Sequence, residues 1–166
     1  MTRTLSPIPL TSAIFAPFGD VIAAHGHSTP INYGHTRRYH DLAAIDVNAQ
    51  GGQTLVNIFR STPLPLPIRI EIMERHPLSS QMFMPLSGNP YLVVVAPKGA
   101  FDESQIKVFL ASANQGVNYH AGTWHHYSLA LDAVSDFLVI DRGGAKNGGN
   151  ANCDEVQLME PIIIEI

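Results

Sequence analysis

Apolar residues along this chain fall into short runs rich in β-branched and aromatic side chains, separated by glycine, proline, asparagine and aspartate. Runs of this length and composition predict β-strands, because a helix would need apolar residues every three or four positions over a longer stretch. The predicted strands are Asp20–Ala23, Arg38–Asp46, Thr54–Arg60, Ile68–Arg75, Met82–Leu86, Tyr91–Ala96, Ile106–Leu110, Gly116–Tyr119, His125–Leu131 and Asp136–Ile140. Many short strands with turns between them indicate an all-β sandwich or barrel.

Outside these strands the pattern predicts little regular structure. Thr11 can cap one short helical turn that reaches Phe15 and stops before Pro17 and Gly19. The segment 143–152 is rich in glycine and asparagine, so we expect a flexible loop there, followed by a C-terminal tail over residues 153–166. We see no internal repeat and no shift of composition along the 166 residues. We therefore expect one domain over residues 1–166.

Composition and charge narrow the classes of function. Charged residues make up 14% of the chain and the formal net charge is −4. Since no run of lysine and arginine is present, nucleic acid is not an expected partner. No apolar run approaches the ~20 residues that span a bilayer, so a membrane is not expected either. Cys153 is the single cysteine, which excludes an internal disulfide and fits the reducing cytoplasm.

Two stretches carry residues suited to acid–base or metal chemistry. In the first, Glu74 and His76 are two positions apart and therefore face the same side of a strand. The second, "YHAGTWHH" from Tyr119, holds three of the chain's eight histidines. Here His125 and His126 are adjacent and should face opposite sides. Because imidazole titrates near neutral pH and also binds metals, His76 and His125 are the leading functional candidates.

The spacing of these residues resembles the two motifs of the cupin superfamily. His76 is followed by Gly88, and His125 is preceded by Gly122, as in those motifs. The resemblance implies a cupin-like double-sheeted β-barrel of jelly-roll type, with minor short helices and a divalent metal inside it. The metal ligands that it implies are Glu74, His76, Gln81 and His125.

This ligand set departs from the usual cupin set. Glu74 stands where histidine is usual, Gln81 where glutamate is usual and His120 where proline is usual. The set is rich in oxygen and contains one neutral amide, so Ni²⁺, Mn²⁺ or Zn²⁺ are the ions we expect, and metal-free operation stays open. No organic cofactor is expected.

A second resemblance is more specific, because it rests on several stretches in the same order. They are "FAPFGDVI" (15–22), "RYHDLA" (38–43), "ERHPL" with Gln81 (74–81), "QGVNYHAGTWHH" (115–126) and "DFLVIDRGG" (136–144). Together they resemble the ureidoglycolate lyase family, from about residue 10 to about residue 153. The resemblance implies cleavage of (S)-ureidoglycolate to glyoxylate and urea in allantoin (purine) catabolism, a homodimer, and activation by nickel or another divalent ion.

That reaction defines roles for the candidate residues. A base must take the hydroxyl proton of the substrate, an acid or Lewis acid must help urea to leave, and a cation must hold the carboxylate. The acid–base candidates are His76, His125 and Glu74, with Gln81 as an orienting group. The candidates for binding the small carboxylate substrate are Arg38, Arg60, Arg75, Arg142, Tyr39 and His40, and the sequence does not choose among the four arginines. We expect structural roles for His126 and Trp124, and a supporting contact to the ligands from His120.

Two other functions are compatible with the same barrel. Two histidines and one carboxylate also suit a metal-dependent oxidoreductase or isomerase acting on a small carboxylate, and metal analysis would separate this class from a lyase. The third interpretation is a non-catalytic small-molecule binding protein. A sensor of that kind normally carries an output domain, which we do not expect within 166 residues.

The C-terminal tail raises the question of assembly. Ile162, Ile163 and Ile164 are consecutive, so an extended strand cannot turn them all to one side. We expect an isolated barrel to have difficulty burying this tail. We therefore expect the tail, or the strand that carries His126, to lie at the contact of a homodimer.

Overall fold

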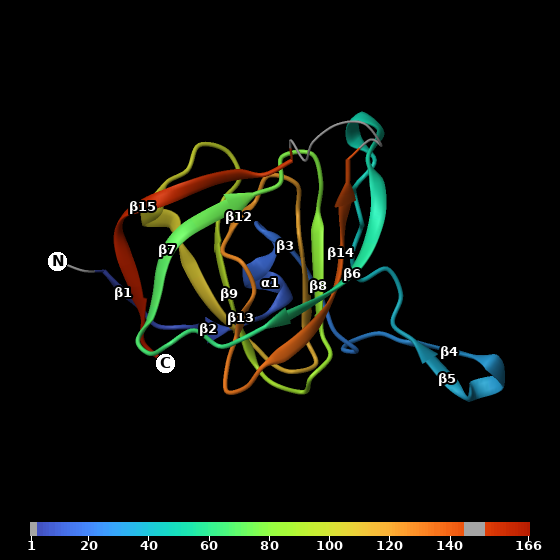
Figure 1. Cartoon of the computed structure of the whole chain (residues 1–166). Coiled ribbons are helices and arrows are strands. Elements are labelled where there is room, and N and C mark those ends of the chain that lie inside the picture. Colours follow the sequence, from blue (N-terminus) through green and yellow to red (C-terminus); the bar gives the residue numbers. More distant parts are fainter. Residues whose placement is uncertain (1–2, 145–151) are drawn as a thin grey trace.

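The computed structural model describes residues 3–144 and 152–166, and strands dominate the part described (Figure 1). One sheet of eight strands has the order β1 (Thr4–Leu5), β15 (Asp154–Ile164), β7 (Ile68–Arg75), β12 (Trp124–His125), β9 (Tyr91–Ala96), β10 (Lys107–Ala111) and β2 (Ile8–Pro9), with β13 (Leu129–Ala130) also paired to β9. A second sheet of five has the order β3 (Gly19–Ile22), β11 (Gly116–Tyr119), β8 (Gln81–Pro85), β14 (Ser135–Gly143) and β6 (Gln53–Ser61). The two curled sheets confirm the expected all-β, cupin-like fold.

The remaining elements are short. A hairpin outside both sheets pairs β4 (Thr29–Ile31) with β5 (Thr36–Arg38). The helical elements are α1 (Ser12–Phe15) and the 3₁₀ turns η1 (Asn32–Gly34), η2 (Ala49–Gly51) and η3 (Glu103–Gln105). Within the residues described, no helix is long and apolar enough to cross a membrane.

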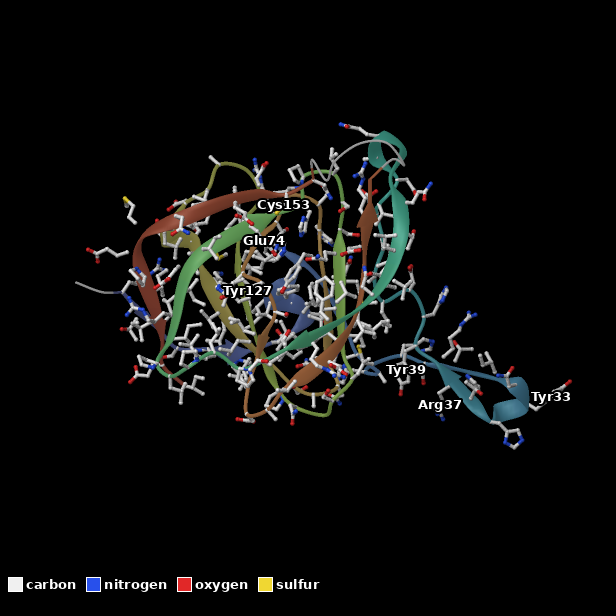
Figure 2. The ribbon with its side chains drawn as sticks, in the orientation of Figure 1. Tyr33, Arg37, Tyr39, Glu74, Tyr127 and Cys153 are labelled. Atoms are coloured by element: carbon white, nitrogen blue, oxygen red, sulfur yellow. The ribbon has the colours of Figure 1, made fainter. Side chains whose placement is uncertain are left out.

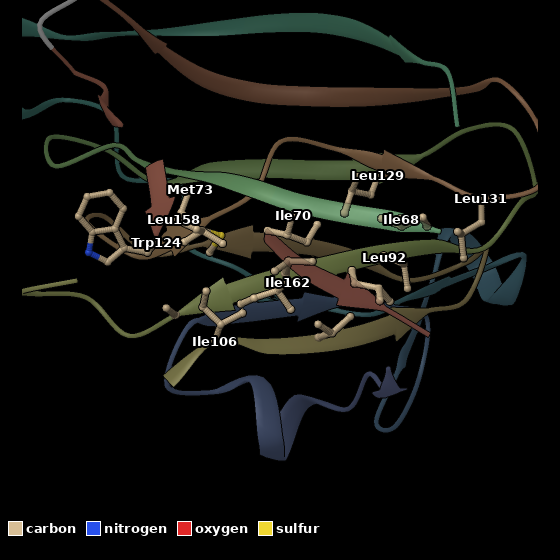
Figure 3. Close-up of a cluster of buried hydrophobic side chains, with 14 residues drawn as sticks. Ile68, Ile70, Met73, Leu92, Ile106, Trp124, Leu129, Leu131, Leu158 and Ile162 are labelled. Carbon is tan, nitrogen blue, oxygen red and sulfur yellow. The ribbon is translucent and has the colours of Figure 1, made fainter. Parts of the chain in front are cut away.

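Strand β9 is buried on both faces and separates two apolar clusters. One face contributes to a cluster between the two sheets, whose largest members are Phe15, Phe18, Phe83, Tyr91, Phe109, Tyr119 and Phe137. The other face contributes to a cluster drawn mainly from β7, β9, β10, β12, β13 and β15, with Ile70, Met73, Trp124 and Ile162 among its members (Figure 3). Since these strands belong to one sheet, that sheet curls around the second cluster. Because β9 buries the side chains of both its faces, its sequence is one continuous apolar run.

The short N-terminal helix is confirmed. Thr11 is its N-cap, with Oγ1 accepting a hydrogen bond from the Ile14 amide at 3.5 Å. The helix buries Phe15 completely, and the Phe15 ring meets Phe109 edge-on with centroids 5.6 Å apart. This aromatic contact fixes α1 against the barrel.

The strand expected over Arg38–Asp46 is wrong, because β5 ends at Arg38 and residues 39–48 form no regular element. Asp41 has a φ of 58°, which interrupts an extended backbone. The backbone of Asp46 is bonded to Ser80 rather than to a strand: its amide donates to Ser80 Oγ at 2.8 Å, and its carbonyl accepts from the Ser80 amide at 2.7 Å.

The strand expected over His125–Leu131 is divided into β12 and β13. Tyr127 and Ser128, between the two pieces, leave the ladder. The Ser128 hydroxyl lies 2.6 Å from Ser61 Oγ instead. The apolar pattern was correct here, but it could not show the break.

The expectation that an isolated barrel would have difficulty burying the C-terminal isoleucines is wrong for Ile162 and Ile164. The tail is strand β15, which pairs antiparallel with β7 and parallel with β1. A register irregularity lies between Gln157 and Ile162. Beyond it, Ile162 and Ile164 are each 2% exposed within the curled sheet, and Ile163 between them is half-buried. The tail therefore completes the core of its own chain.

Most of the flexible loop expected over residues 143–152 (residues 145–151) lies outside the described part of the chain. At its end, Asn152 is 3% exposed and its side chain is bonded to Leu78 and Ser79. The expected end of the loop is therefore wrong, because Asn152 is anchored.

Candidate functional site

Polar side chains from both sheets meet in the barrel interior. In the eight-stranded sheet His125 stands opposite Glu74, and in the five-stranded sheet Tyr119 stands opposite Gln81. Residues opposite one another in a ladder face the same side. The Tyr119 ring stacks on the His125 imidazole, with centroids 4.4 Å apart and planes 15° apart. The two pairs therefore face each other across the barrel.

Glu74, His76 and His125 lie close enough to share one ion. Each offers a ligand atom within 4.8 Å of those of the others. His125 Nε2 is 3.6 Å from Glu74 Oε1, and the two imidazole centroids are 5.2 Å apart. The alternation read from the sequence had placed Glu74 and His76 on one side of a strand, and both join His125 in this cluster.

Backbone carbonyls fix the tautomers of the two imidazoles. His76 Nδ1 is 2.7 Å from the Asn152 carbonyl oxygen, and His125 Nδ1 is 3.0 Å from the Thr123 carbonyl oxygen. A carbonyl oxygen only accepts, so Nδ1 carries the proton in both rings and Nε2 keeps its lone pair. Both Nε2 atoms, and Gln81 Oε1, are buried without a hydrogen-bond partner among the described residues.

The two Nε2 atoms and Gln81 Oε1 are buried acceptors without a donor in the described part of the chain. A cation or a proton bound to them would offset the cost of burying them. A divalent ion fits, because metal-bound histidines commonly use one ring nitrogen for the metal and donate the other N–H to a carbonyl. Glu74, His76 and His125 can supply an oxygen and two nitrogens, and Gln81 Oε1 supplies a further oxygen. Such a mixed nitrogen and oxygen set suits Ni²⁺, Mn²⁺ or Zn²⁺.

Burial shifts the protonation of these groups. Burial, and to a smaller extent the neighbouring His76, lower the pKa of His125 to about 3. Burial also raises the pKa of Glu74, while His76 acts in the opposite direction. The Cys153 thiol lies 3.9 Å from Glu74 Oε2 (Figure 2), and burial together with Glu74 raises its pKa to about 11. Cys153 therefore stays a protonated, weak donor to the carboxylate.

Asp141 is a site neighbour that the sequence reading missed. It accepts a hydrogen bond from Asn57 Nδ2 at 2.9 Å and another from the side-chain amide of Gln81. Because a carboxylate accepts from the NH₂ group, Gln81 Oε1 is turned away from Asp141. Burial raises the pKa of Asp141. Its position two residues after Val139, which faces the inner cluster, is a signal that could have found it.

Beside Asp141 there is a small polar cavity of ≈ 40 Å³. It is lined by His76, Ser79, Gln81, Asp141, Arg142 and Asn152. The cavity is large enough for ordered water next to the His76 imidazole.

Two of the four candidate arginines are paired on the outside of the barrel. Arg60 forms a two-point ion pair with Asp136, at 2.7 and 2.8 Å. Arg75 bonds to Asp154 at 2.8 Å, and its guanidinium lies 4.6 Å from the centre of the Trp124 ring. Arg75 and Glu74 are neighbours in β7, so their side chains point to opposite faces.

The other candidate arginines lie in different places. Arg142 donates through Nε and Nη2 to the Ala49 carbonyl, at 3.3 and 2.9 Å, and lines the small cavity. Arg38 is exposed at the end of β5, with half-buried Tyr39 and exposed His40 following it. Within one copy of the chain, the structure brings Gln81 to the cluster but leaves Arg38, Tyr39 and His40 outside it.

The residues expected to be structural make contacts of that kind. Trp124 is 5% exposed and donates from Nε1 to the Gly99 carbonyl at 3.1 Å. His126 is 2% exposed, its Nδ1 is 3.0 Å from the Tyr127 carbonyl, and burial lowers its pKa to about 4. His120, which was expected to support the ligands, instead has its Nε2 3.1 Å from Asp20 Oδ1 on the surface.

Several known proteins similar to this chain carry the same name. A family model described as ureidoglycolate lyase matches residues 2–165. A ureidoglycolate lyase of Burkholderia mallei is 56% identical over 151 residues, which cover 90% of this chain and 88% of the relative. Relatives of the same name from Azotobacter vinelandii and Pseudomonas paraeruginosa are 52% and 49% identical over 155 residues, covering 92% of this chain and 91% and 89% of theirs.

Proposed function

The chain belongs to the ureidoglycolate lyase family, and we propose that it cleaves (S)-ureidoglycolate to glyoxylate and urea in allantoin catabolism. The structural observation that supports this proposal most directly is that Glu74, His76 and His125 lie close together in the barrel interior. The lone Cys153 fits a cytoplasmic location.

The substrate determines what the site must do. Ureidoglycolate has one carbon that carries a hydroxyl, a carboxylate and a urea nitrogen. When the hydroxyl proton leaves, the oxygen becomes the carbonyl of glyoxylate and the bond from carbon to nitrogen breaks. The departing nitrogen must take up a proton, since an unassisted amide anion is a poor leaving group. The reaction thus needs a proton shuttle and a group that stabilises the substrate oxygens.

Glu74 suits the proton shuttle. In the metal-free protein burial raises the pKa of Glu74, so its carboxylate is a stronger base than an exposed one. We assign to it the removal of the hydroxyl proton and the return of that proton to the urea nitrogen. Glu74 Oε1 faces His125, and Oε2 lies toward Cys153, so the two oxygens can take separate roles.

His76, His125 and Gln81 suit the second task. We propose that these three, together with one oxygen of Glu74, hold a divalent ion, Ni²⁺ in the first place and Mn²⁺ or Zn²⁺ as alternatives. When bound, the ion supplies a Lewis acid that polarises the substrate oxygens. The carbonyls of Asn152 and Thr123 hold the imidazoles in the ligating tautomer. No organic cofactor is required.

The test of the proposed function is the identity of the nitrogen product. Purified protein supplied with (S)-ureidoglycolate is expected to release urea and glyoxylate in equal amounts. Ammonia released in step with glyoxylate would identify an amidohydrolase and overturn the proposal.

We also propose a homodimer, with a contact different from the one expected at the tail. Strand β6 is the last strand of its sheet among the described residues, and its Leu55, Val56, Ile58 and Phe59 are 43, 67, 56 and 37% exposed. An apolar edge strand of this kind is normally covered. We expect a dimer that buries at least ~1,200 Å² in total. Sedimentation at micromolar concentration checks this, and a fully active monomer of 18.1 kDa would rule it out.

A further inference from the structure

The β4–β5 hairpin lacks a covering surface within its own chain. Its two strands pair with each other and with no other strand in the described residues. Every residue from Asn32 to Arg38 is exposed, and Tyr33 is 104% exposed. Figures 1 and 2 show the hairpin outside the barrel, with Tyr33 and Arg37 directed away from it. Since an isolated two-stranded hairpin is marginally stable in water, we expect another surface to hold it.

The hairpin also carries an arginine whose whole guanidinium is without a partner among the described residues. Within the parts of the chain that are described, Arg3, Arg60, Arg69, Arg75 and Arg142 each donate to a carboxylate or carbonyl oxygen. On the hairpin, Arg37 donates to Ser28 Oγ at 3.2 Å. Arg38, adjacent to it, makes no hydrogen bond or ion pair there and is exposed.

The barrel site contains carboxylic acids and must bind an anionic substrate. The acids are Glu74 and Asp141, and the carboxylate of the substrate needs an arginine besides the divalent ion proposed above. The guanidinium of Arg142, the nearest candidate, is held by the Ala49 carbonyl. A guanidinium supplied from outside would complement both the site and the substrate.

A second copy of the chain can supply that guanidinium. Edge strand β6 pairs with β14, and Gly143 of β14 lies opposite Gln53 at the end nearest Asp141. In Figure 1, β14 runs upward to that end, while the hairpin lies low on the same side of the barrel. A twofold axis beside β6 would set the β6 strands of two copies antiparallel. The hairpin of one copy would then lie toward the site end of its partner.

We propose that the β4–β5 hairpin packs on a second copy of this chain and that Arg38 binds the substrate carboxylate in the partner's site. This inference rests on the proposed function and on the proposed dimer. It makes each site composite: the shuttle and ligands come from one copy, and the carboxylate-binding arginine comes from the other.

The first test compares two neighbouring arginines. Arg38→Ala should lower kcat/KM at least ~30-fold, mainly by raising KM, because a two-point contact to the substrate carboxylate is lost. Arg37→Ala is the matched control, since it removes the same charge from the opposite face of the same strand. Native kcat/KM in Arg38→Ala, or equal losses in both variants, would contradict the proposal.

The decisive test mixes two defective variants. Arg38→Ala and His125→Ala are given different tags, allowed to exchange subunits, and assayed with the mixed dimers quantified by tandem affinity capture. Random exchange makes half the dimers mixed, and each mixed dimer contains one site with neither defect, so about a quarter of native activity should return. Mixed dimers without recovered activity would overturn the shared site. Full activity of His125→Ala alone would instead count against the proposed function.

Discussion

Replacing His125 with alanine is expected to lower turnover at least ~100-fold, the scale on which a positioned catalytic group contributes. The same loss is expected for His76→Ala. Each substitution removes an Nε2 lone pair that the structure holds in the cluster with Glu74. The loss should appear in kcat and in the amount of metal retained after gel filtration, because both properties depend on the same nitrogen.

His126→Ala is the control for this experiment. His126 is buried and bonded to the Tyr127 carbonyl, and it is absent from the cluster of potential ligands. His126→Ala should therefore lower the stability of the fold. The protein that remains folded should keep most of the native turnover. Equal losses of turnover for His125→Ala and His126→Ala, with both variants folded, would show that the site faces the other side of β12.

Replacing Glu74 with glutamine is expected to have an effect of similar size, at least ~100-fold on turnover, because an amide keeps a ligand oxygen but cannot take up the hydroxyl proton. The pH profile gives a second measurement. The base must be ionised, so turnover of the native protein should fall as pH is lowered through the pKa of Glu74, which burial raises in the metal-free protein. That acidic limb should be lost in Glu74→Gln.

Glu71→Gln is the matched control, since Glu71 is an exposed carboxylate of the same strand β7 that lies outside the clusters of potential ligands. It should keep native turnover and the native acidic limb. An unchanged acidic limb in the residual activity of Glu74→Gln would assign the limb to another group and remove Glu74 from the shuttle role.

Local sequence patterns were sufficient for much of the sheet structure. The bounds of β7, β9 and β11 agree with the expected strands, because Gly and Pro delimit apolar runs there. Strand alternation also placed Glu74 and His76 on one face. The failures occur where distant contacts override local preference. Residues 39–48 bond to Ser80 and to Asn118 instead of forming a strand. Strand β15 buries its isoleucines because its own sheet curls, and local sequence does not show that curl.

The site shows the same limit. The residue types and spacing identified Glu74, His76 and His125, but the groups that orient them come from far along the chain. Asn152 lies 76 residues from the His76 that it fixes, and its partner atom is a backbone carbonyl, which leaves no trace in residue identity. The roles of the arginines could not be separated either, because an arginine in an ion pair and an arginine awaiting a ligand have the same letter in the sequence.

The most direct measurement of the central claim follows urea, ammonia and glyoxylate together from (S)-ureidoglycolate, with the native protein and with His125→Ala. The account predicts one urea for each glyoxylate from the native protein, ammonia at background, and at least ~100-fold slower release of both products by the variant. Ammonia that rises with glyoxylate would contradict the reaction, and undiminished release by folded His125→Ala would contradict the site.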